Sequence, residues 1–156
     1  MDGGSYRMWR QVELTVIQGR NMGTSKSDSG PGKDDKDDGD GAEVDISCEI
    51  HLNEILCSRT TVQRGLGSPD WHEAFTFPGL PPFEHLEISV WRDKKLSKPS
   101  VLGTTRIALG NFRRGDHVEG WYPVVQPGAI GTEIQVGELR LKIRVDEYAV
   151  FRFYCV

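Results

Sequence analysis

Short stretches in which apolar and polar residues alternate recur along most of this chain. In the cleanest stretch, residues 139–145, apolar side chains occupy the odd positions and Arg140, Lys142 and Arg144 the even ones. A period of two is typical of a β-strand with one buried face, because successive side chains point to opposite faces. Similar runs occur at residues 12–16, 46–52, 55–62, 71–77, 86–90, 101–109 and 121–125. The pattern therefore predicts eight strands.

Turn residues separate these runs, and no stretch shows the 3.6-residue period of an amphipathic helix. Short strands without crossover helices favour antiparallel sheets packed face to face. The predicted fold class is therefore all-β, an eight-stranded antiparallel Greek-key β-sandwich. Residues 78–82 contain three prolines and are expected to form a connection, since proline cannot donate to a sheet ladder.

Composition separates one folded region from polar segments. Residues 23–43 hold seven acids and three lysines with almost nothing apolar, and carry a charge of −4. Such a segment cannot bury enough surface to offset its ordering entropy. We predict a disordered acidic insertion at 23–43 within a domain at 11–146, a polar lead-in at 1–10 and a C-terminal tail at 147–156. Outside the insertion the charges balance, because the whole chain also totals −4.

The sequence also bears on the compartment. No apolar run approaches the ~18 residues that a membrane-spanning helix needs, and residues 1–10 lack the apolar core of a signal peptide. The three cysteines, Cys48, Cys57 and Cys155, are an odd number, which favours reduced thiols. We therefore expect a cytoplasmic protein whose contact with a membrane is peripheral.

Several runs carry motifs that resemble the C2 domain family. Residues 68–77 resemble that family's Asn-Pro-x-Trp-x-Glu-x-Phe-x-Phe, and residues 102–109 resemble its Ile-Gly-x-x-x-Ile-Pro-Leu. Other similar stretches are the first strand with its apical loop (12–22), the strand before the third loop (86–91) and the last two strands (121–124 and 137–143). The signals follow the family's order from about Val12 to Val145. The resemblance implies a C2-type sandwich and a docking module without catalytic activity.

A narrower resemblance is to the C2 domain of Ras-family GTPase-activating proteins, the synaptic Ras GTPase-activating protein group in particular. Residues 48–61 resemble that group's Cys-Glu-Leu-x-Leu-Asp-Asp-Val-Leu-Tyr-Ala-Arg-Thr-Thr, and Trp-Tyr-Pro-Val recurs at 121–124. The group's helical GTPase-activating domain, with its arginine finger, has no counterpart in these residues. The resemblance therefore implies a module that docks such a protein, not GTPase activation itself.

The third loop decides whether the calcium chemistry of C2 domains is expected. Calcium takes six to eight oxygen ligands, and the family's motif there reads Val-x-Asp-x-Asp. In this sequence Arg92 and Lys94 follow Val90 at the two ligand positions, and Asp93 alternates to the other face. Cations at these positions repel a dication. We therefore expect no metal site and no cofactor.

The acidic insertion is the alternative place for calcium. An EF-hand loop needs acids at positions one, three and five, glycine at six and glutamate at twelve. With Gly41 at position six, Ser47 stands at twelve, and with Gly39 at six, Asp45 stands there. Neither register supplies the glutamate. The sequence favours a solvated acidic linker, with a calcium sensor as the less favoured hypothesis.

Catalytic patterns are weak. His72 and Glu73 open like a zinc-protease motif, but Thr76 stands where the second histidine is needed. Cys48 and His51 lie an odd number of residues apart on one strand, so they point to opposite faces. We expect no enzymatic activity from these residues.

One group of basic residues crowds the third loop: Arg92, Lys94, Lys95 and Lys98, with Trp91 beside them as a candidate apolar wedge or as a residue packed under the loop. A cation near an anionic membrane surface contributes about 1 kcal/mol. The first hypothesis is therefore a calcium-independent contact with anionic phospholipid that docks a Ras-family GTPase-activating protein at the membrane.

A second basic group, Arg140, Lys142 and Arg144, lines the polar face of the last strand. These cations would pair with acidic residues of a small Ras-family GTPase or of a neighbouring GTPase-activating domain. The second hypothesis is therefore a protein-interaction scaffold. No nucleic-acid partner is expected in either case.

Overall fold

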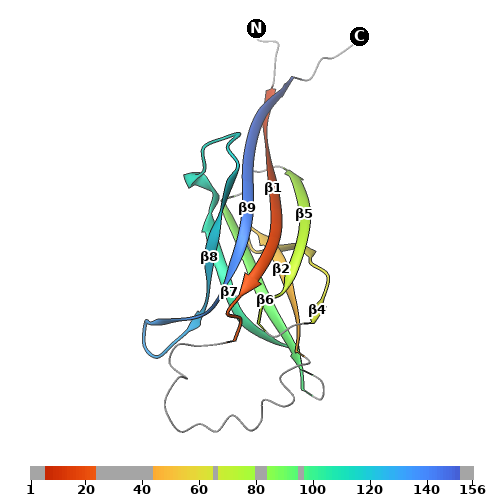
Figure 1. Ribbon diagram of the computed structural model, residues 1–156. Helices are drawn as coiled ribbons and strands as arrows, with labels where there is room; N and C mark the ends of the chain where they lie inside the picture. Colours follow the sequence, from red (N-terminus) through yellow and green to blue (C-terminus); the bar gives the residue numbers. More distant parts are fainter. Residues whose placement is uncertain (1–5, 24–43, 65–66, 80–83, 95–96, 152–156) are drawn as a thin grey trace.

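The computed structural model describes residues 6–23, 44–64, 67–79, 84–94 and 97–151, which form antiparallel strands arranged in two packed layers (Figure 1). The strands are β1 (Tyr6–Arg20), β2 (Val44–Leu52), β3 (Ile55–Arg59), β4 (Gln63–Arg64), β5 (Asp70–Gly79), β6 (His85–Lys94), β7 (Ser100–Ala108), β8 (Val118–Pro127) and β9 (Glu133–Phe151). A single 3₁₀ turn (Leu109–Asn111) follows β7. Each of the eight predicted runs forms a strand.

The strands are hydrogen-bonded in the order β3-β2-β6-β7-β8-β9-β1-β5, and β4 pairs with β2 beside β3. Only one residue pair, Thr104 with Val125, joins β7 to β8. The path therefore divides into a β3-β2-β6-β7 sheet and a β8-β9-β1-β5 sheet, nearly closed on each other. The predicted all-β antiparallel sandwich is confirmed.

The core lies between the two layers and takes the apolar positions of each alternating run. Leu139, Leu141 and Ile143 of β9 are fully buried. On β5, Trp71 is buried, and Phe75 and Phe77 pack against the core with their ring centroids 6.1 Å apart. In both β9 and β5, therefore, the side chains on one face of the strand form part of the core, as the alternation predicted.

Three strand boundaries differ from the sequence-based expectation. β1 begins at Tyr6 and pairs there with Phe151 of β9, so residues 6–10 and 147–151 belong to strands and not to a lead-in and a tail. Backbone hydrogen bonds between two long neighbouring strands form whatever the polarity of the side chains. The run expected at 55–62 ends at Arg59, and the two-residue β4 makes a ninth strand.

Pro78 was also expected outside the sheet, but it lies in β5 opposite Gln11. β5 ends the strand order, and an edge strand tolerates proline because its outward side has no ladder to break. Residues 24–43 lie outside the described residues, so the disorder of the acidic insertion stays a prediction.

Strand direction places several connections together. β1, β6 and β8 run the same way, because β6 and β8 are both antiparallel to β7, and β8 and β1 are both antiparallel to β9. Arg20, Lys94 and Pro127 therefore finish their strands at one end of the molecule, called the loop end below (Figure 1).

The start of the β1–β2 connection is fixed at this loop end. The Met22 amide donates to the Gly67 carbonyl at 3.0 Å, and the Gly23 amide donates to the Val136 carbonyl at 2.8 Å. The Met22 side chain is buried, and a Cβ on Gly137 would lie 2.6 Å from its sulfur. Glycine at 137 therefore lets β9 approach this buried methionine.

Candidate functional site

The third-loop cations lie where β6 reaches the loop end. Arg92 pairs with the buried Ile46 across the strand, and Lys94 pairs with Val44, which packs against the core. Both cations therefore follow the core-facing side of β6 beyond the core. Trp91 and Asp93 lie on the opposite face, as the alternation predicted.

Arg92 is the innermost of these cations. It is half-buried, and its Nη1 lies 4.0 Å from the position that a Cβ on Gly23 would take. The guanidinium therefore reaches from β6 toward the start of the β1–β2 connection. Lys94 and Lys98 are exposed, whereas Lys95 lies outside the described residues.

None of Arg92, Lys94 and Lys98 forms an ion pair within 4.0 Å in the part of the chain that the structure describes. Among the described residues, no carboxylate compensates these charges. The surface that they form is called the loop-end basic group below.

The sequence left two roles open for Trp91, an exposed apolar wedge and a residue packed under the loop, and the structure shows features of both. Its ring is half-buried, and its Nε1 is shielded from solvent with no hydrogen-bond partner among the described residues. Its cross-strand neighbour is Val101, which is 45% exposed. The two side chains form an apolar spot on the face of the β6–β7 pair opposite to Arg92 and Lys94.

Sequence reasoning missed Val101 because the β6–β7 register shifts between Val90 and Trp91. Val90 faces Gly103 and Trp91 faces Val101, so β7 has one residue more than β6 at this point. Such a bulge reverses which residues of β7 point outward. Nothing in the alternation of 101–109 marks it.

The second basic group, the β9 stripe of Arg140, Lys142 and Arg144, differs in its surroundings. Arg140 pairs with Glu119 at 3.0 Å, and Arg144 pairs with Asp146 at 3.1 Å. Lys142 is exposed opposite Glu119 of β8. Acids on the same sheet face therefore compensate most of the positive charge of the stripe.

No group of three or more His, Cys, Asp or Glu side chains suited to a metal occurs among the described residues. Asp93 lies opposite Asp45 on β2, and Asp45 already contacts Arg64 at 3.4 Å. The acidic insertion lies outside the described part of the chain.

The suspected catalytic residues are separated or engaged elsewhere. Burial and the nearby Glu73 carboxylate raise the pKa of the Cys48 thiol well above its usual range, so it stays protonated in the core. His51 lies on the other face of β2, 3.9 Å from Glu49. His72 contacts Asp70 at 2.6 Å, whereas Glu73 accepts a hydrogen bond from the Thr61 hydroxyl at 2.7 Å. No convergent acid, base and nucleophile results.

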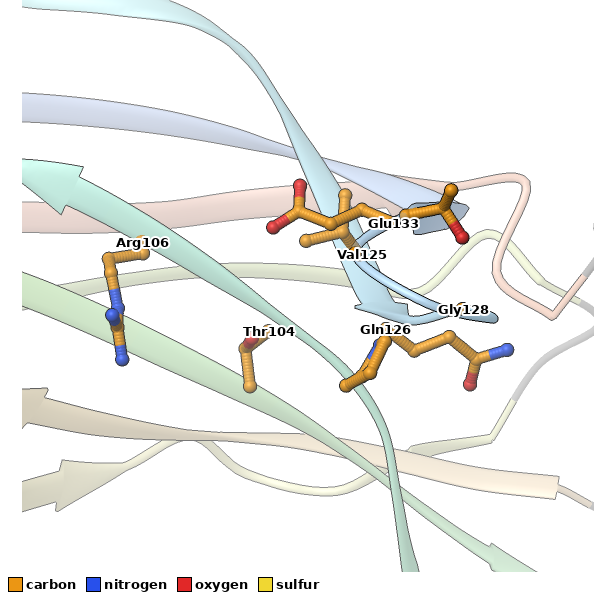
Figure 2. Close-up of a pocket in the computed structure, with 9 residues that line it drawn as sticks. Thr104, Arg106, Val125, Gln126, Gly128 and Glu133 are labelled. Carbon is orange, nitrogen blue, oxygen red and sulfur yellow. The ribbon is translucent and has the colours of Figure 1, made fainter.

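A groove of about 440 Å³ opens where β7 and β8 diverge beyond their single pair (Figure 2). Arg106 and Glu133 are the charged residues of its lining. Arg106 is held by Glu87 at 2.9 Å, so the groove offers no net positive charge to an anion. The groove arises from sheet divergence, which no local sequence pattern reports.

No helix in the described ranges is long and apolar enough to cross a membrane.

Comparison with known proteins now decides the family. Residues 10–124 match the family described as the C2 domain. This chain belongs to the C2 domain family. A solved C2 domain of plant Extended Synaptotagmin 1 aligns with a TM-score of 0.61 at 19% identity, covering 88% of this chain and 95% of that one. The fold inferred from strand order and packing is thus that of a solved C2 domain.

Two curated relatives bear on the narrower resemblance. Human Ras GTPase-activating protein nGAP is 32% identical over 107 residues, which cover 66% of this chain and 9% of that protein. Human Disabled homolog 2-interacting protein has the same identity and coverage. The resemblance to C2 regions of Ras GTPase-activating proteins is confirmed. This C2 domain spans about a tenth of the length of these relatives.

Proposed function

We propose that this C2 domain binds anionic phospholipid without calcium through the loop-end basic group. The observation that carries the proposal is the position of Arg92, whose guanidinium reaches toward Gly23 between the first and third loops. A C2 domain that binds calcium needs carboxylates in this region, and a fixed cation disfavours a dication there. The cation instead faces the membrane directly.

The neighbouring residues support this role. Lys94 and Lys98 are exposed and have no ion pair in the described ranges, and Lys95 adds a third lysine in the sequence. Each contributes about 1 kcal/mol near an anionic surface. Trp91 and Val101 place an apolar spot on the opposite face of β6, near the same end of the strand. A contact of this size is weak and reversible, which suits docking at the cytoplasmic leaflet.

The relatives suggest what is docked. A Ras GTPase-activating protein acts on a GTPase, and we infer that a C2 domain of this kind holds such a protein at the membrane. The domain itself is then a non-catalytic, peripheral membrane module. The acidic insertion carries a charge of −4, and we expect it to compete with lipid headgroups for the same lysines.

The test is sedimentation with vesicles of phosphatidylserine and phosphatidylcholine in the presence of a calcium chelator. Reversing two loop-end charges, Lys94→Glu with Lys98→Glu, should weaken binding by about 30-fold or more, from about 1 kcal/mol per lysine lost. The matched control is Arg113→Glu with Lys142→Glu, which reverses two exposed cations away from the loop end. Equal losses for both variants would reject the assignment to the loop end.

A protein-interaction scaffold is the second candidate, and an edge strand favours it. On β3, Ile55 is 68% and Leu56 is 42% exposed, and the outward side of this strand has no ladder partner in the described sheet. Such an edge can pair with an extended segment of another domain. The contact predicted for Arg140, Lys142 and Arg144 stays a prediction, weakened by their internal ion pairs.

Calorimetry with the GTPase-activating domain of the nGAP relative distinguishes the two surfaces. Loss of binding with Leu56→Lys and retention with Arg140→Glu would identify the β3 edge. The reverse result would identify the β9 stripe.

A further inference from the structure

The turn between β8 and β9 presents one large apolar side chain to solvent. Ile130 is 99% exposed, more than the other exposed apolar side chains of the described residues. Its neighbours Ala129 and Gly131 are also exposed, and residues 124–132 contain no charged side chain. The tip is therefore both apolar and free of the charges that would oppose its transfer into lipid.

Hydrogen bonds hold this turn in place. The Gly128 amide donates to the Thr132 carbonyl at 2.7 Å, and the Thr132 hydroxyl donates to the Ala129 carbonyl at 2.5 Å. Ile130 and Gly131 have φ values of +34° and +70°. Glycine and asparagine suit such positions, whereas a β-branched residue is strongly disfavoured. The stability of the turn therefore does not explain isoleucine at 130.

The turn lies at the loop end of the molecule. β6 and β8 run in the same direction, so the turn that follows Pro127 and the loop that follows Lys94 leave the sheets at the same end (Figure 1). A membrane that contacts the loop-end cations therefore faces the same end of the molecule as the turn that carries Ile130. One isolated side chain is too small for a protein interface, but it suits the boundary between headgroups and acyl chains.

We propose that Ile130 is a membrane anchor that inserts into the acyl boundary of the leaflet whose headgroups the loop-end cations contact. This inference rests on the proposed lipid binding and names a second contact for it. It also changes the role of Trp91, which the sequence suggested as the wedge. Trp91 is half-buried and its Nε1 is hidden, whereas Ile130 is free to insert.

The first experiment compares Ile130→Ser with Ile55→Ser, a matched change at an exposed isoleucine on the β3 edge. On vesicles of phosphatidylserine and phosphatidylcholine, Ile130→Ser should bind about tenfold more weakly, because its apolar transfer is lost. Ile55→Ser should bind like the wild type. Wild-type binding with an unchanged Ile130→Ser variant would overturn the anchor alone. Absence of wild-type binding would overturn both the anchor and the proposed function.

The second measurement tests insertion itself. Ile130→Trp should gain fluorescence quenching by lipids brominated on their acyl chains, relative to the wild type, and Ile55→Trp should not. Analytical ultracentrifugation without lipid tests a different occupant, a second copy of the chain. A wild-type dimer that Ile130→Ser converts to a monomer would overturn the anchor, because Ile130 would then be covered by protein.

Discussion

The two basic groups of this C2 domain look alike in the sequence and differ in the structure. Both consist of cations at or near alternate positions of a strand. Arg140 and Arg144 of the β9 stripe lie beside Glu119 and Asp146, whereas Lys94 and Lys98 at the loop end have no ion pair in the described ranges. The count of cations is therefore a poor guide to the charge that a surface presents.

Strand position explains this difference. β9 lies between β8 and β1, so strands that carry polar side chains flank its outer face on both sides. At the end of β6, in contrast, no acid among the described residues lies within ion-pair distance of Lys94 or Lys98. Exposed ion pairs add little to stability, but they cancel the field that a partner would sense. The β9 stripe is thus compensated within its own sheet, whereas the described residues do not compensate the loop-end group.

The largest effect on stability is expected for a substitution on the buried face of β9, whose side chains form part of the core. Leu141 is fully buried in the core, so Leu141→Ala should lower the free energy of unfolding by about 2–5 kcal/mol through lost contacts and a residual cavity. Its neighbour Lys142 is exposed, and Lys142→Ala should change stability by less than about 0.5 kcal/mol. Urea denaturation measures both. Similar losses for the two variants would contradict the division of β9 into a core face and a solvent face.

Salt should act next most strongly, and on the loop-end group. Screening shortens the reach of exposed charges from about 10 Å at 0.1 M salt to about 3 Å at 1 M. Raising salt from 0.1 to 0.5 M should therefore weaken vesicle binding by about tenfold while leaving the melting temperature nearly unchanged. Affinity that does not respond to salt would mean that the unpaired lysines do not drive the contact.

The smallest effect is expected for the ion pairs of the β9 stripe. A double-mutant cycle on Arg140 and Glu119, each changed to alanine, should give a coupling of about 0.2–1 kcal/mol, the usual value for exposed pairs. Chemical denaturation of the four proteins supplies the cycle. A coupling near zero would show that Arg140 is as free as Lys94, and the contrast between the two groups would disappear.

Local alternation was enough to predict the parts of the fold and site that lie within one strand. It identified Leu139, Leu141 and Ile143 as core, and it placed Arg92 and Lys94 on the same side of β6. Relations between strands were not accessible in this way. The bulge that brings Val101 beside Trp91, and the pairing of Arg140 with Glu119, depend on the register between strands.

The C2 resemblance helped with strand order and with the loops, since it relates distant parts of the chain. It did not point to Ile130, because no motif covers the β8–β9 turn. The strand boundaries at residues 6–10 and 147–151 were missed because apolar and polar residues do not alternate regularly there. Pairing along β1 and β9 satisfies those backbone groups without an alternating pattern in the sequence.

The central claim is that fixed cations at the loop end take the place of bound calcium. The most direct measurement is the affinity of the wild-type domain for phosphatidylserine vesicles, once with a chelator and once with millimolar calcium, at constant ionic strength. The account predicts the same affinity in both conditions and no calcium-dependent rise in melting temperature. Binding that appears only when calcium is added, together with such a rise, would contradict it.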